Sequence, residues 1–209
     1  MSEDISLFDT MYHCRAMRRL DTKPVPEELL LKLIDAANQA PSGSNMQNGR
    51  WLVVRDADVK QKLADLNRAG VEAYLPSADA GGSLPHQDAG KRKRMVESVL
   101  WQKEHMHEIP ALVIACLDHG TKVDGLEVYR GGGSIWPGVQ NLLLAARALG
   151  LGAAPTTLAL QDQDAVRAVL GLPDRMAAHC LIPVGYPLGN FGPVTRKPVE
   201  EIMRFDRWE

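Results

Sequence analysis

The chain has 209 residues, enough for one large domain or two small ones with a substantial core. Hydrophobic side chains make up 45% of it and charged ones 24%, a composition that is ordinary for a soluble globular protein. The formal net charge of -2 at pH 7 gives no reason to expect nucleic acid or an anionic membrane as the partner.

Apolar periodicity and turn residues predict a mixture of helices and strands. Leu29, Leu33 and Ala37, for example, recur at helical spacing, and Pro26 suits the first turn of that helix. The run PALVIACLD is almost continuously apolar, which is typical of a strand buried on both faces. In chain order the patterns predict helix 26–40, strand 51–55, helix 58–68, helix 91–107, strand 110–118, helix 139–149, helix 161–173 and strand 179–187.

Two connecting segments lack such a pattern. Residues 69–90 are rich in Gly, Ser, Pro and Ala and are interpreted as a loop. Because a structureless connection of this length is unusual in a compact domain, the segment is either a lid or partly helical. A bend is predicted at 131–133, and the tail 188–209 has little amphipathic pattern. With no repeat or linker, one α+β domain over 1–209 is predicted.

Cysteine usage and the amino terminus predict a cytoplasmic protein. The three cysteines are widely spaced without a C-x-x-C pair, so neither a disulfide framework nor a zinc site is indicated. The amino terminus is acidic where a signal peptide would be basic and then apolar. The most apolar long segment, 135–155, is interrupted by Gln140, Asn141 and Arg147 and is not predicted to span a membrane.

Two basic clusters lie at opposite ends of the chain. Arg15, Arg18 and Arg19 form the first, and Arg196 with Lys197 forms the second. Each could be a solvated charged face. Alternatively, the guanidinium groups could bind an anion, since they hold phosphate in two-pronged fashion. The spacing leaves open whether the two clusters converge on one phosphate.

The sequence GLGAAP at 150–155 half matches the dinucleotide fingerprint G-x-G-x-x-G. That fingerprint must follow a strand and open a helix, whereas this one follows a predicted helix. Gly150 and Gly152 are therefore interpreted as the helix stop. The next three residues, 155–157, are predicted to form a small polar turn that could offer N–H groups and hydroxyls to a ligand.

Two other chemistries are not indicated. His105 and His107 lie two residues apart on a predicted helix, so their side chains point away from each other and cannot share a metal. No serine has a G-x-S-x-G elbow, so acyl transfer has no support. No metal site is predicted.

Four segments, in the right order and spanning almost the whole chain, resemble the FMN-dependent nitroreductase family. Its pattern is R-S-x-R, followed about two dozen residues later by A-P-S-x-x-N-x-Q-P-W. The matching segments are RAMRRLDTKPVPEELLLKLIDAANQAPSGSNMQNGRWLVV, VQNLLLAARALGLGAAPTT, IPVGYP and RKPVEEIMRFDRW. The resemblance implies a central, mostly antiparallel sheet flanked by helices, and an interlocked homodimer in which the tail packs on the partner.

The same resemblance implies where FMN binds. The loop after the first long helix would lie against FMN bound mainly by the partner subunit, with Ser42 and Asn45 reaching across the interface. Arg15 and Arg18 would serve the phosphate and pyrimidine end, and the turn 155–157 would face the ring edge that holds N5. The implied cofactor-binding residues are Arg15, Ala16, Met17, Arg18, Pro41, Ser42, Gly43, Asn45, Gln47, Pro155, Thr156, Thr157, Arg196 and Lys197.

The chain departs from the family pattern at three places. Ala16 stands where the family has Ser, so a backbone group must replace one hydroxyl contact. The dipeptide 48–49 is Asn-Gly in place of Pro-Trp, and Cys14 stands where many relatives carry a second Arg. Arg196 would close on the phosphate, with Lys197 as a second candidate.

The resemblance implies an oxidoreductase whose chemistry belongs to the flavin. Electrons from NADH or NADPH would pass through flavin N5, in ping-pong fashion, to a small acceptor such as a nitroaromatic, a quinone or an enone. No catalytic side chain is required. One alternative is a relative with the same fold that performs reductive dehalogenation or flavin fragmentation. The variable lid region that the resemblance implies, 69–107, would distinguish such a relative. The other alternative is a non-catalytic FMN-binding or storage protein.

Overall fold

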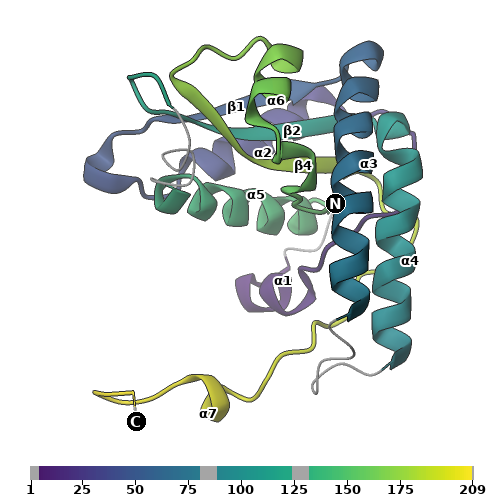
Figure 1. Cartoon of the computed structure of the whole chain (residues 1–209). Helices are drawn as coiled ribbons and strands as arrows, with labels where there is room; N and C mark the ends of the chain where they lie inside the picture. The colour runs from purple at the N-terminus through teal and green to yellow at the C-terminus, as the bar shows by residue number, and fades with distance from the viewer. Residues whose placement is uncertain (1–4, 81–88, 124–131, 209) are drawn as a thin grey trace.

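The computed structural model describes residues 5–80, 89–123 and 132–208 (Figure 1). Short 3₁₀ turns at 43–45, 106–108, 132–134 and 158–160 connect some of the longer elements. Those elements are α1 Leu7–His13, α2 Glu27–Asn38, β1 Gly49–Val54, α3 Ala57–Ala80, α4 Ala89–His105, β2 Ala111–Asp118, α5 Trp136–Ala148, β3 Gly152–Ala153, α6 Gln163–Leu170, β4 Met176–Gly185 and α7 Val199–Ile202.

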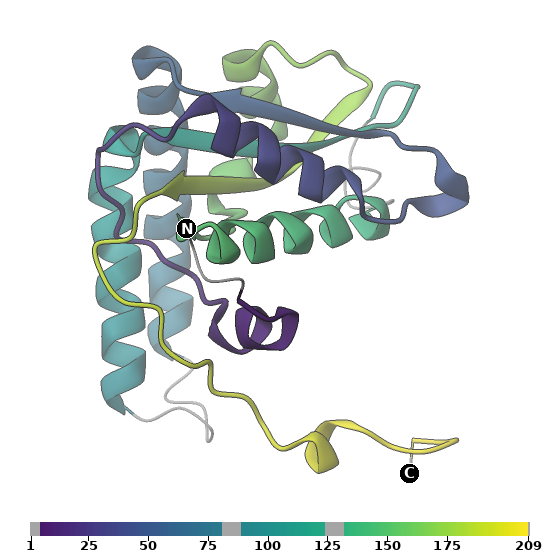
Figure 2. The same ribbon diagram turned by 180° about the vertical axis from the view of Figure 1, so that it is seen from behind.

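The four strands form one antiparallel sheet with the order β1-β2-β4-β3. Trp51 pairs with Ala115, and Val113 pairs with Ile182. Helices lie on both faces of this sheet (Figures 1 and 2). The predicted α+β class, with a mostly antiparallel sheet flanked by helices, is confirmed.

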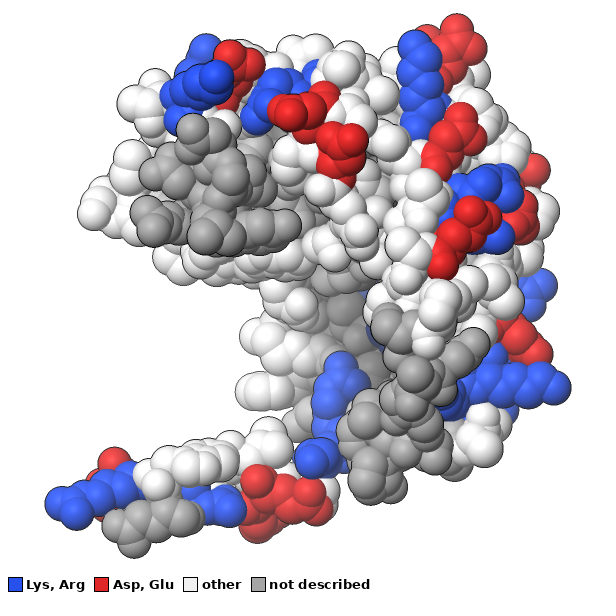
Figure 3. All heavy atoms as spheres, viewed as in Figure 1, with Lys and Arg blue, Asp and Glu red and all other residues white. Residues whose placement is uncertain are grey.

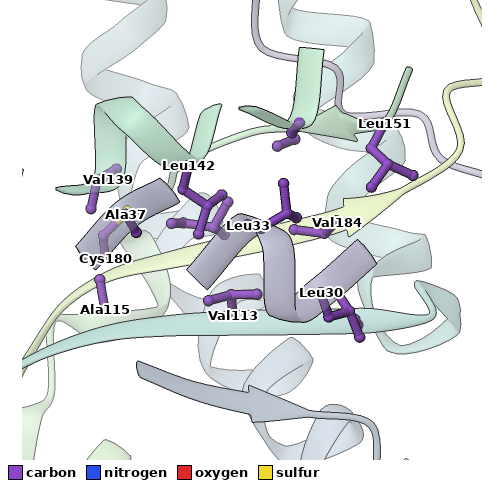
Figure 4. Packing of buried hydrophobic residues seen from close by; sticks show 14 of the residues in the cluster. Leu30, Leu33, Ala37, Val113, Ala115, Val139, Leu142, Leu151, Cys180 and Val184 are labelled. Atoms are coloured by element: carbon purple, nitrogen blue, oxygen red, sulfur yellow. The ribbon is translucent and has the colours of Figure 1, made fainter. Parts of the chain in front are cut away.

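The two sides of β2 belong to two different hydrophobic clusters. Val113 and its alternate neighbours pack with α2 and α5, where side chains such as Leu33 and Leu142 point toward the sheet (Figure 4). Leu112 and Ile114 point to the other face and pack with α3 and α6. Because both faces are covered, a strand pattern that alternates apolar and polar residues would leave polar groups buried, which explains the continuous apolar run.

The loop interpretation of 69–90 is wrong for residues 69–80, which continue α3 through Pro76, and the partly helical alternative is confirmed. Residues 81–88 lie outside the described part. Gly70 allows the backbone near Leu158 to approach this helix closely, because a Cβ atom there would lie 2.7 Å from the Leu158 carbonyl carbon and closer still to its oxygen. α3 and α4 stand side by side, joined by an ion pair of 2.6 Å between Arg68 and Glu104 (Figures 1 and 2).

The tail first runs along the body and then extends away from it toward α7 (Figures 1 and 2). Along the attached part, the Leu188 amide donates to the Arg19 carbonyl at 3.0 Å. The Phe191 ring lies 4.3 Å from the Arg147 guanidinium carbon. Beyond Thr195 the tail leaves large apolar side chains uncovered: Val199, Ile202, Phe205 (81% exposed) and Trp208 (73% exposed).

The short helix α1 was not predicted from the sequence. It is capped by Ser6, whose hydroxyl accepts a hydrogen bond from the Asp9 amide at 3.1 Å. Phe8 and Tyr12 on this helix are also exposed. Within the described ranges, none of the helices combines the length and the apolar character that a membrane span requires.

Candidate functional site

The segment after α1 is fixed against β3. The Met17 amide donates to the Ala153 carbonyl at 3.0 Å. A Cβ atom on Gly152 would lie 2.6 Å from Leu20 Cδ2 and 3.0 Å from Met17 Cβ, so only glycine permits this close approach. The prediction that Gly152 belongs to the helix stop is therefore wrong, because it is a residue of β3. Gly150 alone, with φ +73°, ends α5.

Arg18 is a half-buried cation that follows the first helix. Burial lowers the pKa of its guanidinium, and the neighbouring Tyr74 of α3 partly opposes this change. Within the described residues, no carboxylate lies at ion-pair distance from Arg18. A half-buried charge of this kind is costly unless an opposite charge compensates it, which favours an anionic ligand here.

The tail brings Arg196 back to the same segment. Burial raises the pKa of the Cys14 thiol, while Arg147 and Arg196 lower it, which places Arg196 near Cys14. The tail also passes Arg15, whose Nη1 lies 3.4 Å from the position that a Cβ on Gly192 would occupy. The two remote basic clusters thus lie in one region. Arg15, Ala16 and Arg196 are exposed, and Lys197 lies 4.0 Å from Glu201 of its own tail.

The turn 155–157 directly follows β3, and so lies near the arginine segment. Thr156 forms a two-way backbone pair with Leu181 at 2.8 and 3.0 Å. Its hydroxyl accepts from the Leu158 amide at 3.2 Å, while Pro155 is half-buried and Thr157 is exposed. The turn is therefore rigid, and Thr157 has the more accessible hydroxyl.

The loop 41–48 is held in shape by its own polar groups. The Gly43 amide donates to Ser134 Oγ at 3.0 Å, and the Gln47 amide donates to Ser42 Oγ at 3.0 Å. Gln47 Nε2 also donates to Asn45 Oδ1 at 3.2 Å. Ser42 and Gln47 line a cavity of about 30 Å³ that Trp51 and Ser134 also border, while Pro41 is exposed.

Three non-glycine residues of this loop adopt the left-handed region of backbone space. Their φ values are 50° at Ser44, 52° at Asn45 and 49° at Gln47. Each such residue costs free energy, of order 1–3 kcal/mol when strained, and clusters of them are typical of ligand sites. The short polar side chains of 42–48 suit this conformation because they hydrogen-bond their own backbone.

The two halves of the predicted site lie apart in one chain. Ser134, which anchors the loop 41–48, precedes α5, whereas Cys14 contacts the Leu143 carbonyl at 3.6 Å, just past the middle of that helix. At the usual helical rise, Leu143 lies roughly 10 Å along the axis from the first residue of α5. Figure 2 shows the loop at one end of α5 and α1 below its middle. One chain therefore does not bring all the predicted residues together.

Tyr74, Ser134 and Trp101 border the site but were missed by sequence reasoning. Trp101 of α4 lies under Arg19, with the guanidinium carbon 6.0 Å from the ring centroid. Tyr74 could have been found from the four-residue spacing of Leu66, Gly70 and Tyr74, because residues at this spacing lie on one face of a helix. The Gly, Pro and Ser content of the segment obscured that signal.

One further pair of titratable groups lies away from this site. His119 and His179 stack with ring centroids 6.2 Å apart, and burial, followed by the charge of His119, lowers the pKa of His179. Among the described residues, no group of three or more His, Cys, Asp or Glu side chains is placed to hold a metal ion.

The nitroreductase family model matches residues 13–186. The chain belongs to the nitroreductase family. Its relatives include a Thermus thermophilus protein named NADH dehydrogenase, 32% identical, with 90% of each chain covered. They also include the iodotyrosine deiodinase of Nematostella vectensis, 28% identical over 94% of this chain and 73% of the relative.

Among solved structures, an iodotyrosine deiodinase bound to FMN and 3-iodo-L-tyrosine has a TM-score of 0.75 and 25% identity, with 97% of this chain and 100% of that chain covered. The family and the relatives' names indicate an oxidoreductase.

Proposed function

We propose that the protein is an FMN-dependent oxidoreductase that takes electrons from NADH or NADPH and gives them to a small acceptor. The observation that carries the proposal is the gathering of Arg15, Arg18 and Arg196 around one segment, where none of the described residues pairs them with a carboxylate. Guanidinium groups without a protein counter-ion fit the phosphate of FMN.

The residues of the chain fit the rest of the flavin as well. The turn 155–157 is rigid and near the arginine segment, so it suits the ring edge, and the amides of Asn45 and Gln47 suit the ribityl chain and the pyrimidine edge. When bound, the flavin supplies hydride acceptance and electron transfer to a nitroaromatic, a quinone or an enone. The chain supplies binding and orientation, and none of its side chains serves as a nucleophile.

A homodimer is part of the proposal, because one chain separates the two halves of the site. In a dimer, the loop 41–48 of one subunit would complete the site that the arginine segment of its partner begins. The uncovered apolar side chains beyond Thr195 suit burial against that partner. A cytoplasmic location is proposed as well, since Cys14, Cys116 and Cys180 are all unpaired.

The first test is the flavin itself. We expect the purified protein to be yellow with about one FMN per chain, and NADH or NADPH to bleach its absorbance under anaerobic conditions. A nitroaromatic, a quinone and an enone, added in turn, should restore the colour. A colourless protein that does not bind added FMN would contradict the proposal, and a loaded protein that neither nucleotide bleaches would indicate a storage protein.

The second test is assembly. Light scattering at micromolar concentration should give a dimer, because obligate interfaces bury over about 2,000 Å². A chain ending at Pro198 lacks the apolar tail but keeps Arg196, and it should dissociate to monomers and lose FMN. The control is Phe205→Tyr, which keeps the ring and should remain dimeric. A full-length monomer that holds FMN would contradict the composite site.

Reductive dehalogenation is the second candidate, because relatives at 28% and 25% identity are named iodotyrosine deiodinase. The two candidates share the flavin site and differ in the acceptor. Dithionite-reduced protein given 3-iodo-L-tyrosine should release iodide if dehalogenation is the activity. Turnover of a nitroaromatic without iodide release favours the first candidate.

A further inference from the structure

The tail runs antiparallel along the arginine segment. The Leu188 amide donates to the Arg19 carbonyl at 3.0 Å, and further along the tail the Val194 amide donates to the Tyr12 carbonyl at 2.9 Å. Figure 3 shows Lys and Arg side chains at the point where the tail leaves the body, with Asp and Glu side chains further along the tail. The part of the tail between these two hydrogen bonds therefore lies beside the basic residues that precede Arg19.

Two neighbouring residues of this part of the tail lie against two arginines. The Phe191 ring lies 4.3 Å from the Arg147 guanidinium carbon. A Cβ atom on Gly192 would lie 3.4 Å from Arg15 Nη1. Arg147 belongs to the last turn of α5, so a cation from a third part of the chain lies beside the same short stretch of the tail as Arg15.

Cys14 gives independent evidence for this arrangement. Its thiol donates to the Leu143 carbonyl at 3.6 Å, and in a regular helix that carbonyl also accepts from the amide of Arg147. Burial raises the pKa of the Cys14 thiol, whereas the charge of Arg147 and, to a smaller extent, that of Arg196 lower it. Because Arg15 directly follows Cys14 in the chain, three cations from three parts of the chain surround one residue.

Local structure explains only part of this arrangement. The carboxyl end of a helix favours a cation, and the contact with the Phe191 ring stabilises the Arg147 guanidinium further. Neither provides a hydrogen-bond acceptor, and Arg147 Nε is buried without a partner. In the described ranges, no carboxylate forms an ion pair with Arg15, Arg147 or Arg196. Like charges that meet without a counter-ion favour a bound anion.

We propose that Arg147 joins Arg15 and Arg196 in binding the phosphate of the flavin, an inference that rests on the proposed function. The family resemblance does not imply this role for Arg147. The Phe191 ring orients its guanidinium. Because the N–H donors of a guanidinium lie in its plane, a ring against one face leaves them free for phosphate oxygens.

The test measures the preference of the full-length protein for FMN over riboflavin, which has the same ring system and ribityl chain but no phosphate. FMN-loaded protein is equilibrated with a mixture of the two flavins, and the bound flavins are quantified after gel filtration. The wild type should prefer FMN by about 100-fold or more, as expected for several charge-assisted contacts. Since both flavins compete for the same folded molecules, partial unfolding of a variant does not change the ratio.

Arg147→Ala should lower this preference by about 10-fold or more, because one charge-assisted contact is lost. Arg147→Lys keeps the charge without the planar fork and should fall between Arg147→Ala and the wild type. The matched control is Arg167→Ala on α6. Arg167 is also half-buried with a buried Nε that lacks a partner, but its Nη1 pairs with Asp164 at 2.6 Å. The control should keep the wild-type preference.

A second pair of variants tests the ring. Phe191→Leu keeps an apolar side chain without the aromatic face, and it should lower the preference several-fold. Arg147→Ala combined with Phe191→Leu should be no worse than Arg147→Ala alone, because the ring acts through the guanidinium. Fully independent losses in the double variant would overturn the role of Phe191.

The outcomes separate the two proposals. A wild type that holds neither flavin contradicts the proposed function. A wild type that holds FMN, together with an Arg147→Ala variant that keeps the full preference for FMN over riboflavin, overturns only the role of Arg147.

Discussion

Gly70→Ala should lower the free energy of unfolding by about 2–3 kcal/mol or more, as expected for overpacking against a backbone that cannot move aside. The new Cβ would lie 2.7 Å from the Leu158 carbonyl carbon and closer to its oxygen. For a chain of this size the melting temperature should fall by roughly 5–10 °C. Thermal unfolding followed by circular dichroism at one protein concentration measures the shift.

Ala69→Gly is the matched control on the exposed side of the same helix. Alanine is the better helix former by about 1 kcal/mol, so propensity alone would make Gly70→Ala stabilising and Ala69→Gly destabilising. We expect both changes to destabilise, with Gly70→Ala the worse. A stabilised Gly70→Ala variant would show that α3 does not pack against the 158–160 turn in solution.

Arg18→Ala and Arg196→Ala should each weaken FMN binding by about 10- to 150-fold, the equivalent of roughly 1.5–3 kcal/mol for a lost charge-assisted contact. Arg18 is half-buried, no carboxylate of the described residues forms an ion pair with it, and Arg196 lies in the same region. FMN titration of the apoprotein, followed by quenching of flavin fluorescence at one ionic strength, measures both losses.

Arg19→Ala is the neighbouring control and should change FMN affinity little. Arg19 is exposed and lies over the Trp101 ring of α4 at 6.0 Å. Its contact is worth about 0.5–1 kcal/mol at an exposed site, and it would affect the docking of α4 more than the phosphate. If Arg19→Ala caused the largest loss of FMN affinity of the three variants, the assignment of Arg15 and Arg18 as the flavin-facing residues would be wrong by one position along the chain.

Several elements could be predicted because their evidence lies within a short stretch of chain. The apolar run of β2 indicates a strand covered on both faces, and the helical spacing of Leu29, Leu33 and Ala37 indicates α2. The four segments that resemble the nitroreductase family predicted the family, which the match over 13–186 confirms. For the helix and the strand, the neighbours that matter are at most four residues away or recur at a fixed spacing.

Other features depended on residues far apart in sequence. Gly70 looks like a helix breaker until the Leu158 backbone is seen beside it, and Gly152 looks like a helix stop until Met17 and Leu20 occupy the space of its missing side chain. The sequence around a glycine does not show whether another backbone packs closely against it. A glycine needed for its backbone freedom and a glycine needed because it has no side chain look identical in the sequence.

The sequence alone determined the family, the α+β class and the types of polar and basic groups available for a flavin. The tertiary structure alone decided their arrangement: Arg18 is half-buried beside Tyr74, Arg196 returns to the arginine segment, and the loop 41–48 is anchored on Ser134, before the start of α5. The physical reason is that burial and charge compensation depend on which side chains meet in space. These contacts between side chains are set by the strand order of the sheet and by helix packing, and not by spacing along the chain.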